Sequence, residues 1–173
     1  MQLKVGVVAL VAGLQCLPAT GWTQSFTITA EIVEGCAING STQSISVDYG
    51  TLSFGTHPAV LAGPVVGSVM LGAAPVQLQC TPNLALDLSI GAGLHASAGQ
   101  RQLQHTGNTT YRVPYFLYTT PAHTTAIPTT GSTSVTVPGS GVLALPVYGV
   151  AQLPGTGLLP GAYTDSLQIT VTW

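Results

Sequence analysis

The stretch that decides the fold class is PGAYTDSLQITVTW, residues 160–173, at the end of the sequence. After a Pro-Gly turn its side chains alternate, and this period of two is typical of a half-buried β-strand. No partner strand follows it along the chain, so we expect the pairing strand to come from elsewhere. The face that we expect to be buried carries Tyr163, Leu167, Ile169, Val171 and Trp173.

A second alternating stretch, SFTITAEI at residues 25–32, lies near the opposite end of the sequence. It predicts another strong strand, because apolar and polar side chains again alternate over more than six positions. Threonine, glutamate and valine occupy the opposite face of this strand. The expected apolar face consists of Phe26, Ile28, Ala30 and Ile32.

Between these stretches, 21 glycines and 12 prolines interrupt segments rich in threonine and valine. Such punctuation favours short strands and turns over helices, so we predict an all-β sandwich or barrel. The segment 119–134 is rich in Gly, Thr and Ser, and we expect it to be the most mobile loop. The other predicted strands span residues 43–47, 50–55, 75–80, 85–90, 101–105, 110–119, 134–137 and 142–152.

The composition is unusual for its lack of charge: 46% of the residues are hydrophobic and only 5% are charged. Its 173 residues fit a single domain. The net charge is −2, and beyond Lys4 the only Lys or Arg residues are Arg101 and Arg112. Nucleic acid and anionic lipid are therefore not expected partners, because both require a basic surface.

The N-terminus predicts a secretory signal peptide, because Lys4 precedes an apolar run at residues 5–14 and small residues follow. We expect residues 1–23 to be removed. The mature chain then comprises an N-terminal extension at residues 24–35 and a β-sandwich domain at residues 36–173.

Removal of the signal peptide leaves two cysteines, Cys36 and Cys80, in a chain destined for an oxidising compartment. A disulfide is the expected state there, although two buried thiols are the alternative. Closing a loop of about 45 residues contributes about 4 kcal/mol in the chain-entropy model.

The sequence contains few residues in arrangements typical of catalytic sites. Its five acidic residues and four histidines are widely separated, and none of the common catalytic or metal-binding motifs occurs. We therefore expect no enzymatic activity, no cofactor, no metal and no small-molecule substrate.

Five segments resemble the spore coat protein U domain, the fold of the subunits of archaic (Csu-type) chaperone-usher pili. The segment with the most specific features is YGVAQLPGTGLLPGAYTDSLQITVTW, with its P-G-x-Y-x-D pattern and alternating finish. The others are SFTITAEI at residues 25–32, YGTLSFGT at 49–56, VQLQCTPN at 76–83 and VPYFLYTT at 113–120.

This resemblance implies an immunoglobulin-like sandwich that lacks its last strand and is completed by donor-strand complementation. The donor strand would present Phe26, Ile28, Ala30 and Ile32 to a neighbouring subunit. The acceptor groove and chaperone contact would include Leu167, Ile169, Val171 and Trp173.

The resemblance also implies partners and a location. A periplasmic chaperone would first lend a strand and hold the C-terminal carboxylate, and an outer-membrane usher would then assemble the subunits into a heterologous polymer. The chain would be exported to the periplasm and then displayed on the cell surface as part of an extracellular pilus, or fimbria. Its expected roles are cell adhesion and biofilm formation.

Two other interpretations remain open from the residues alone. A small outer-membrane β-barrel fits the alternating, aromatic terminal strand, but Pro114 and Pro146 fall in the best central strands, where a closed barrel offers no free edge. A secreted coat or binding protein that completes its own sandwich is the other interpretation. In that protein Tyr111, Tyr115 and Tyr118 could line a ligand surface.

Overall fold

The structure is a computed structural model that describes residues 27–173 except 39, 41 and 43–48. The chain divides into two units, Met1–Ile32 and Val33–Trp173. In the first unit the described residues, 27–32, are exposed and contain no strand. Phe26 of the predicted donor face and the predicted strand at 43–47 lie outside the described residues.

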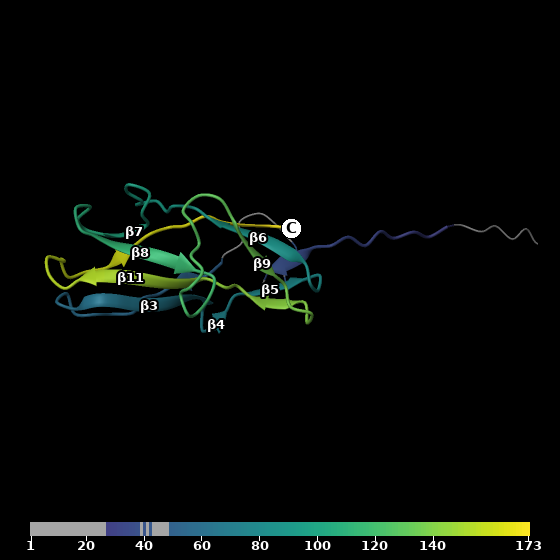
Figure 1. The fold of residues 1–173 in the computed structure, drawn as a ribbon, viewed down its shortest axis with the longest axis horizontal. Coiled ribbons are helices and arrows are strands. Elements are labelled where there is room, and N and C mark those ends of the chain that lie inside the picture. The colour runs from purple at the N-terminus through teal and green to yellow at the C-terminus, as the bar shows by residue number, and fades with distance from the viewer. Residues whose placement is uncertain (1–26, 39, 41, 43–48) are drawn as a thin grey trace, which may run out of the picture. The chain divides into compact units, whose positions relative to one another are not determined.

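The second unit is all-β, as the sequence predicted, and its described residues contain no helix. Its sheets are arranged as a sandwich around one apolar core (Figure 1). The strands are β1 (Cys36–Ile38), β2 (Thr51–Leu52), β3 (Ala62–Leu71), β4 (Ala74–Pro75), β5 (Gln77–Cys80), β6 (Ala85–Ile90), β7 (Gln102–His105), β8 (Arg112–Tyr118), β9 (Thr133–Thr136), β10 (Val142–Ala144), β11 (Tyr148–Pro154), β12 (Tyr163–Thr164) and β13 (Ile169–Thr172).

The largest sheet has the order β12-β7-β8-β11-β3-β2, and its long strands β8, β11 and β3 lie side by side in Figure 1. β11 pairs antiparallel with both of its neighbours, so that Val150 lies opposite Val66 on β3 and Phe116 on β8. Two smaller sheets, β1-β5-β10 and β13-β6-β9, complete the fold.

The sequence did not predict β3, which is the longest strand described. Gly63, Pro64 and Gly67 hid it, because glycine and proline are normally depleted from strand interiors. Gly67 has a steric reason to lack a side chain: a Cβ there would collide with the carbonyl oxygen of Ser53. Because the segment 51–55 approaches so closely, position 67 requires glycine. Glycine in turn weakens the sequence pattern by which a strand is predicted.

Two predicted strands are each divided in the structure. The segment 142–152 forms β10 and β11, and Pro146, which has no N–H to donate to a ladder, lies between them. The terminal segment forms β12, which pairs with β7, and β13, which pairs with β6. The chain therefore passes from one sheet to another around Asp165.

The core draws alternating side chains from all three sheets, and the largest fully buried ones include Leu78, Ile90 and Leu117. The loop 119–134 that we expected to be mobile contributes to it as well. Ile127 is buried in this loop and its amide donates to the carbonyl of Leu117 at 2.8 Å. Its middle is thus bonded to β8.

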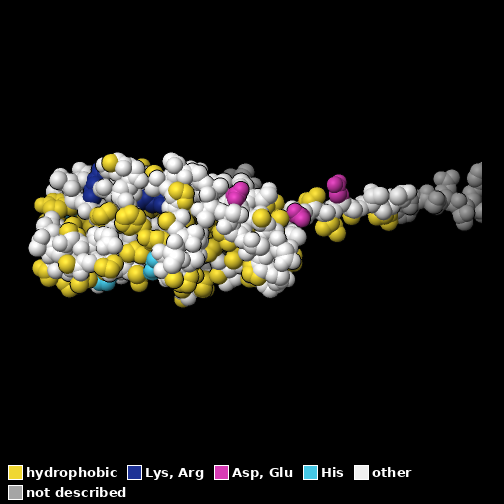
Figure 2. All heavy atoms as spheres, viewed as in Figure 1, with side chains coloured by type: hydrophobic (Ala, Val, Ile, Leu, Met, Phe, Trp, Pro, Cys, Tyr) yellow, Lys and Arg dark blue, Asp and Glu magenta, His cyan; other side chains and the backbone are white. Residues whose placement is uncertain are grey.

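The surface carries few charges, as the composition requires, and Figure 2 shows a face that is mostly uncharged with scattered hydrophobic side chains. The part of the chain that the structure describes has no helix of the length and apolarity that a membrane span needs.

Candidate functional site

The terminal strand β13 has one edge that no described strand covers. On its other edge it pairs antiparallel with β6, where Ile169 lies opposite Ile90. The amide of Gly91 donates to the carbonyl of Gln168 at 2.9 Å, so the even-numbered residues direct their backbone groups toward β6. The odd-numbered residues direct their N–H and C=O groups to the open edge.

β1 also has an edge that is unpaired among the described residues, since it pairs only with β5. The amide of Thr81 donates to the carbonyl of Gly35 at 3.0 Å, which places the backbone groups of Cys36 and Ile38 on the open side. Both open edges can therefore accept main-chain hydrogen bonds from an added strand.

The disulfide expected from the sequence joins Cys36 of β1 to Cys80 of β5. The two residues lie directly opposite each other in the ladder, with their Cα atoms 4.0 Å apart. This spacing is that of a pair that shares no backbone hydrogen bonds, the closer of the two antiparallel pair types. The bridge fixes the start of β1 to the sheet, directly after the N-terminal extension.

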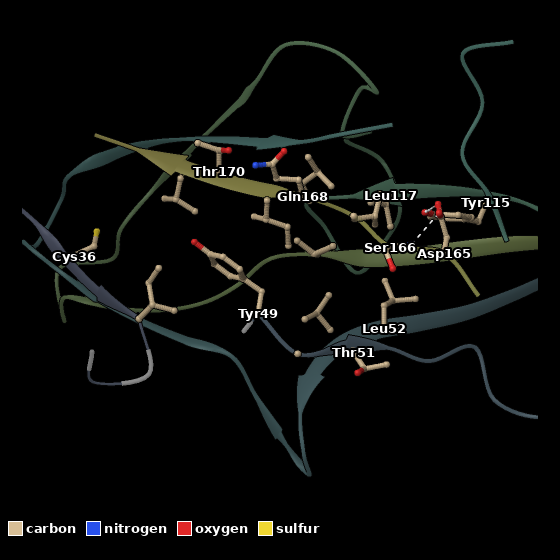
Figure 3. Close-up of a pocket in the computed structure, with 18 of the residues that line it drawn as sticks. Cys36, Tyr49, Thr51, Leu52, Tyr115, Leu117, Asp165, Ser166, Gln168 and Thr170 are labelled. Atoms are coloured by element: carbon tan, nitrogen blue, oxygen red, sulfur yellow. Dashed lines mark hydrogen bonds between the residues drawn. The ribbon is translucent and has the colours of Figure 1, made fainter. Parts of the chain in front are cut away.

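A groove of about 740 Å³ opens beside β13. Its floor includes Ile90, Leu117 and Val147 from the buried core. Across from β13, the opposite side is formed by Ile38 and the segment Tyr49–Leu52, as Figure 3 shows for Tyr49, Thr51 and Leu52. The groove is therefore a depression with an apolar floor, open at the side of the sandwich.

The four residues predicted to form the groove wall all line this cavity: Leu167, Ile169, Val171 and Trp173. The first three are half-buried and pack against the core, whereas Trp173 is 56% exposed. Even-numbered residues of the strand are exposed, so the alternation in the sequence corresponds to a groove side and a solvent side.

One end of the groove is polar and is built around Asp165, whose side chain is 2% exposed. The hydroxyl of Tyr115 donates to Oδ2 of Asp165 at 2.7 Å. Oδ1 accepts from the amides of His95 at 3.1 Å and Ser166 at 2.9 Å. Nδ1 of His95 lies 3.2 Å from the same oxygen. These contacts hold the chain where it passes from β12 to β13.

Arg101 lies buried behind this end of the groove, with 2% of its surface exposed. Its guanidinium donates to four carbonyl oxygens, at distances from 2.6 to 2.9 Å. These carbonyls come from two places: the end of β6 with the residue after it, and the loop 119–134. The acceptors are Ile90, Gly91, Ile127 and Pro128.

Burial shifts the pKa values of three groups at the groove. It lowers the pKa of Arg101, an effect opposed by the charges of Tyr115 and Asp165. The pKa of the Tyr115 phenol is raised well above its usual value, first by burial and then by the hydrogen bond to Asp165. Burial also raises the pKa of Tyr49. Each shift reflects a side chain held away from water.

Sequence reasoning missed this polar cluster. From the sequence, Arg101 counted only as one of two basic residues beyond Lys4, and nothing near it in sequence indicates burial. The one sequence signal for this cluster was Asp165, which is the last residue of the P-G-x-Y-x-D pattern. Its partners Tyr115, His95 and Gly93 come from distant segments, and a Cβ at Gly93 would collide with the Asp165 carboxylate.

The predicted donor residues that the structure describes have no buried side chains. Ile28 is 81% exposed and Ile32 is 95% exposed, and Ala30 is exposed as well. Large apolar side chains exposed in an alternating row are unfavourable in water.

The described residues offer little for catalysis or metal binding. No group of three or more His, Cys, Asp or Glu side chains among them lies close enough together to hold a metal ion. Asp165 is engaged by Tyr115 and by two backbone amides. The arrangement can accept a strand, with free backbone edges and an apolar floor, and this is the chemistry that it supports best.

Residues 22–170 match the Spore Coat Protein U domain family. Protein U of Myxococcus xanthus is 27% identical over 178 residues, which cover 99% of this chain and 98% of that protein. The family match confirms the resemblance read from the sequence.

Two solved structures are more distantly similar, and the chain spans about two fifths of each. The first is the CsuC-CsuE chaperone-tip adhesion subunit pre-assembly complex from archaic chaperone-usher Csu pili of Acinetobacter baumannii. It is 17% identical with a TM-score of 0.45, over 82% of this chain and 40% of that chain. The second is a chaperone-tip adhesin complex of CFA/I fimbriae biogenesis, 16% identical with a TM-score of 0.40, over 75% of this chain and 39% of that chain.

Proposed function

The chain belongs to the Spore Coat Protein U domain family, and we propose that it is a structural subunit of an extracellular pilus assembled by donor-strand exchange. The observation that carries this proposal is the open groove with an apolar floor between β13 and the segment formed by Ile38 and Tyr49–Leu52. Among the described residues, β13 and β1 each have one edge without a partner strand.

The N-terminal extension has the properties that this groove requires of an occupant. Its apolar face, Phe26, Ile28, Ala30 and Ile32, alternates with the period of a strand, so one face can enter the groove while the other stays in water. Adding a strand to a sheet edge provides main-chain hydrogen bonds along its length, and side-chain pockets add specificity. Each large apolar side chain buried in this way stabilises the complex by about 1.5–3 kcal/mol.

The geometry of such an exchange predicts a filament. The donor segment and the acceptor groove are different surfaces of one chain, so each contact is heterologous and leaves a free donor at one end and a free groove at the other. Contacts of this kind repeat without closing unless the rotation between subunits forms a ring. A nearly uncharged surface is compatible with a protein that functions as a polymer.

The partners and location follow from the proposed pathway. A periplasmic chaperone would cover the groove until an outer-membrane usher presents the next subunit, and residues 1–23 would direct export. The assembled pilus would lie at the cell surface, where it would serve adhesion and biofilm formation. The sequence resemblance to archaic pilus subunits supports these assignments.

A second candidate is a coat protein that works as a self-contained sandwich, and the name of the family favours it. In that protein the extension at residues 24–35 would complete the groove of its own domain. The two candidates differ in a measurable property, because only the first makes strand-linked multimers.

The test uses the full chain produced in cells that assemble it. Surface material is analysed by electrophoresis in SDS with and without boiling, since strand-complemented subunits resist SDS until heated. We expect a ladder of multimers from the unchanged chain and at least a tenfold loss of multimers from the double variant Ile28→Asp, Ile32→Asp. The matched control is Thr27→Asp, Thr29→Asp, which places the same charges on the opposite face.

Two results would contradict the proposal. One is a monomer that remains soluble and folded after residues 24–35 are deleted, without a chaperone. The other is a multimer ladder that the Ile28→Asp, Ile32→Asp variant forms as well as the unchanged chain.

A further inference from the structure

The groove is not uniform along its length, because the side chain of Tyr49 projects into its middle. In Figure 3 the ring of Tyr49 extends from the side opposite β13 toward the strand that carries Gln168 and Thr170. Tyr49 is half-buried and packs against the apolar core. Its ring takes up space that an incoming side chain would otherwise occupy, and we call this position the narrow point.

The backbone directly after Tyr49 is held by close packing and strand pairing. Gly50 adopts a φ of 85°, and a Cβ at this residue would collide with the carbonyl oxygen of Met70. Directly after it, Thr51 pairs with Met70 and Leu52 with Val69 in the ladder between β2 and β3. The backbone at the narrow point is therefore anchored directly after Tyr49.

The donor face contains one small side chain among large ones. Phe26, Ile28 and Ile32 are bulky, whereas Ala30 presents a single methyl group. A strand entering the groove can bring only one of these side chains to the narrow point. Forcing an isoleucine or phenylalanine against Tyr49 would overpack the site, which is destabilising in a well-filled core.

We propose that Ala30 of a second copy of this chain lies against Tyr49, and that this pair sets the register of the incoming strand. The inference rests on the proposed function and names the contact that positions its donor. A slip of one residue would turn Thr29 or Glu31 inward, and a slip of two would place Ile28 or Ile32 against the ring. Tyr49 thus allows only one register of the donor strand. In that register Ile28 and Ile32 enter the groove on either side of Tyr49.

The test exchanges the sizes of the two side chains in the full-length chain. Ala30→Leu should reduce the SDS-resistant multimers at least tenfold, because its larger side chain meets Tyr49. Ala30 is exposed in the structure of the single chain, so this substitution does not disturb the fold of the subunit. Combining it with Tyr49→Ala should restore multimers to within about threefold of the unchanged level. Thr29→Leu, on the opposite face, is the control for added hydrophobicity.

A second measurement reads the register directly. Chains with Ala30→Cys and chains with Tyr49→Cys are produced together, and the assembled material is treated with a short bismaleimide. We expect crosslinked pairs from this combination, and at least tenfold fewer from Ile28→Cys or Ile32→Cys combined with Tyr49→Cys. Equal crosslinking from all three donor positions would overturn the proposal.

The outcomes separate the register from the function that it serves. If Ala30→Leu assembles like the unchanged chain while Ile28→Asp, Ile32→Asp still blocks assembly, the register is wrong and the pilus proposal stands. If neither set of variants changes the multimers, donor-strand exchange itself is wrong.

Discussion

The strands β11 and β13 both fall in stretches that the sequence predicts to be strands, but their surroundings in the structure differ. β11 is paired along both edges, with β3 and with β8, and its Val150 and Ala151 are buried. β13 is paired on one edge among the described residues, and its Ile169 and Val171 remain half-exposed. An apolar strand is fully buried only when both of its edges have neighbours, so β13 has the character of an interior strand placed at an edge.

The open edge is nevertheless held in a defined shape. The Cys36–Cys80 disulfide holds β1 against β5, and the Asp165 carboxylate fixes the chain at the start of the segment that leads to β13. A preformed site binds more tightly than one that must order on binding, because less conformational entropy is lost. The difference between β11 and β13 therefore concerns strand pairing more than order, and three sets of substitutions can test it.

The largest expected effect comes from Arg101, which connects β6, the neighbour of β13, to the rest of the core. Arg101→Met removes the partner of four carbonyl oxygens. Leaving buried acceptors unsatisfied costs about 1–3 kcal/mol each, so we expect the free energy of unfolding to fall by at least about 4 kcal/mol. Urea denaturation of the purified full chain, followed by circular dichroism, measures it.

Arg112→Met is the matched control, since this half-exposed arginine donates at 2.9 Å to the carbonyl of His95 and at 3.4 Å to that of Thr109. We expect a loss of about 1 kcal/mol. Equal effects at both positions would mean that Arg101 does not connect the two regions.

A pair of alanine substitutions compares an interior strand with the edge strand directly. Leu78→Ala in β5, a strand paired on both edges where Leu78 is 1% exposed and does not line the groove, should lower the free energy of unfolding by about 3 kcal/mol. Ile169→Ala in β13 removes a half-buried side chain, so the loss should be about 1 kcal/mol in the single chain. The loss of multimers, divided by the loss of stability, should be larger for Ile169→Ala than for the leucine variant. The reason is that Ile169 would be covered only by a donor strand. If Ile169→Ala assembles normally, β13 does not border the acceptor site.

Much of the groove could be predicted from the sequence, because alternation reports which side chains face inward. The inward face of β13 was found in this way. Its role as a groove wall came from the family resemblance, and the cysteine pair from the two cysteines that remain after removal of the signal peptide. Alternation does not report how many neighbours a strand has, however. An open edge at the terminal strand was expected only from the family resemblance, and the pairing of the described strands shows one at β13.

The polar end of the groove could not be predicted from the sequence. Arg101 bonds to carbonyls up to 27 residues away, and Asp165 contacts Tyr115 across 50 residues. Every residue has a main-chain carbonyl, so the sequence does not show which carbonyls accept hydrogen bonds from an arginine. A buried arginine that binds them therefore cannot be told from a surface arginine by sequence. β3 was missed for the opposite reason, since close packing around Gly67 required a residue that weakens the strand pattern.

The smallest expected effect lies at the junction of the two regions, where Tyr115 of β8 donates to Asp165 at the end of the groove. The pKa of Tyr115 is raised in the folded chain above its ordinary value of 10.0, so the folded state keeps its proton at pH values where the unfolded state loses it. The resulting stability is complete below pH 10 and decreases above it, by about 1 kcal/mol between pH 10 and 11. Tyr115→Phe should remove this part of the pH dependence in urea denaturation, whereas Tyr118→Phe should leave it unchanged. An unchanged slope in Tyr115→Phe would mean that water reaches the phenol, and that this end of the groove is as open as the edge beside β13.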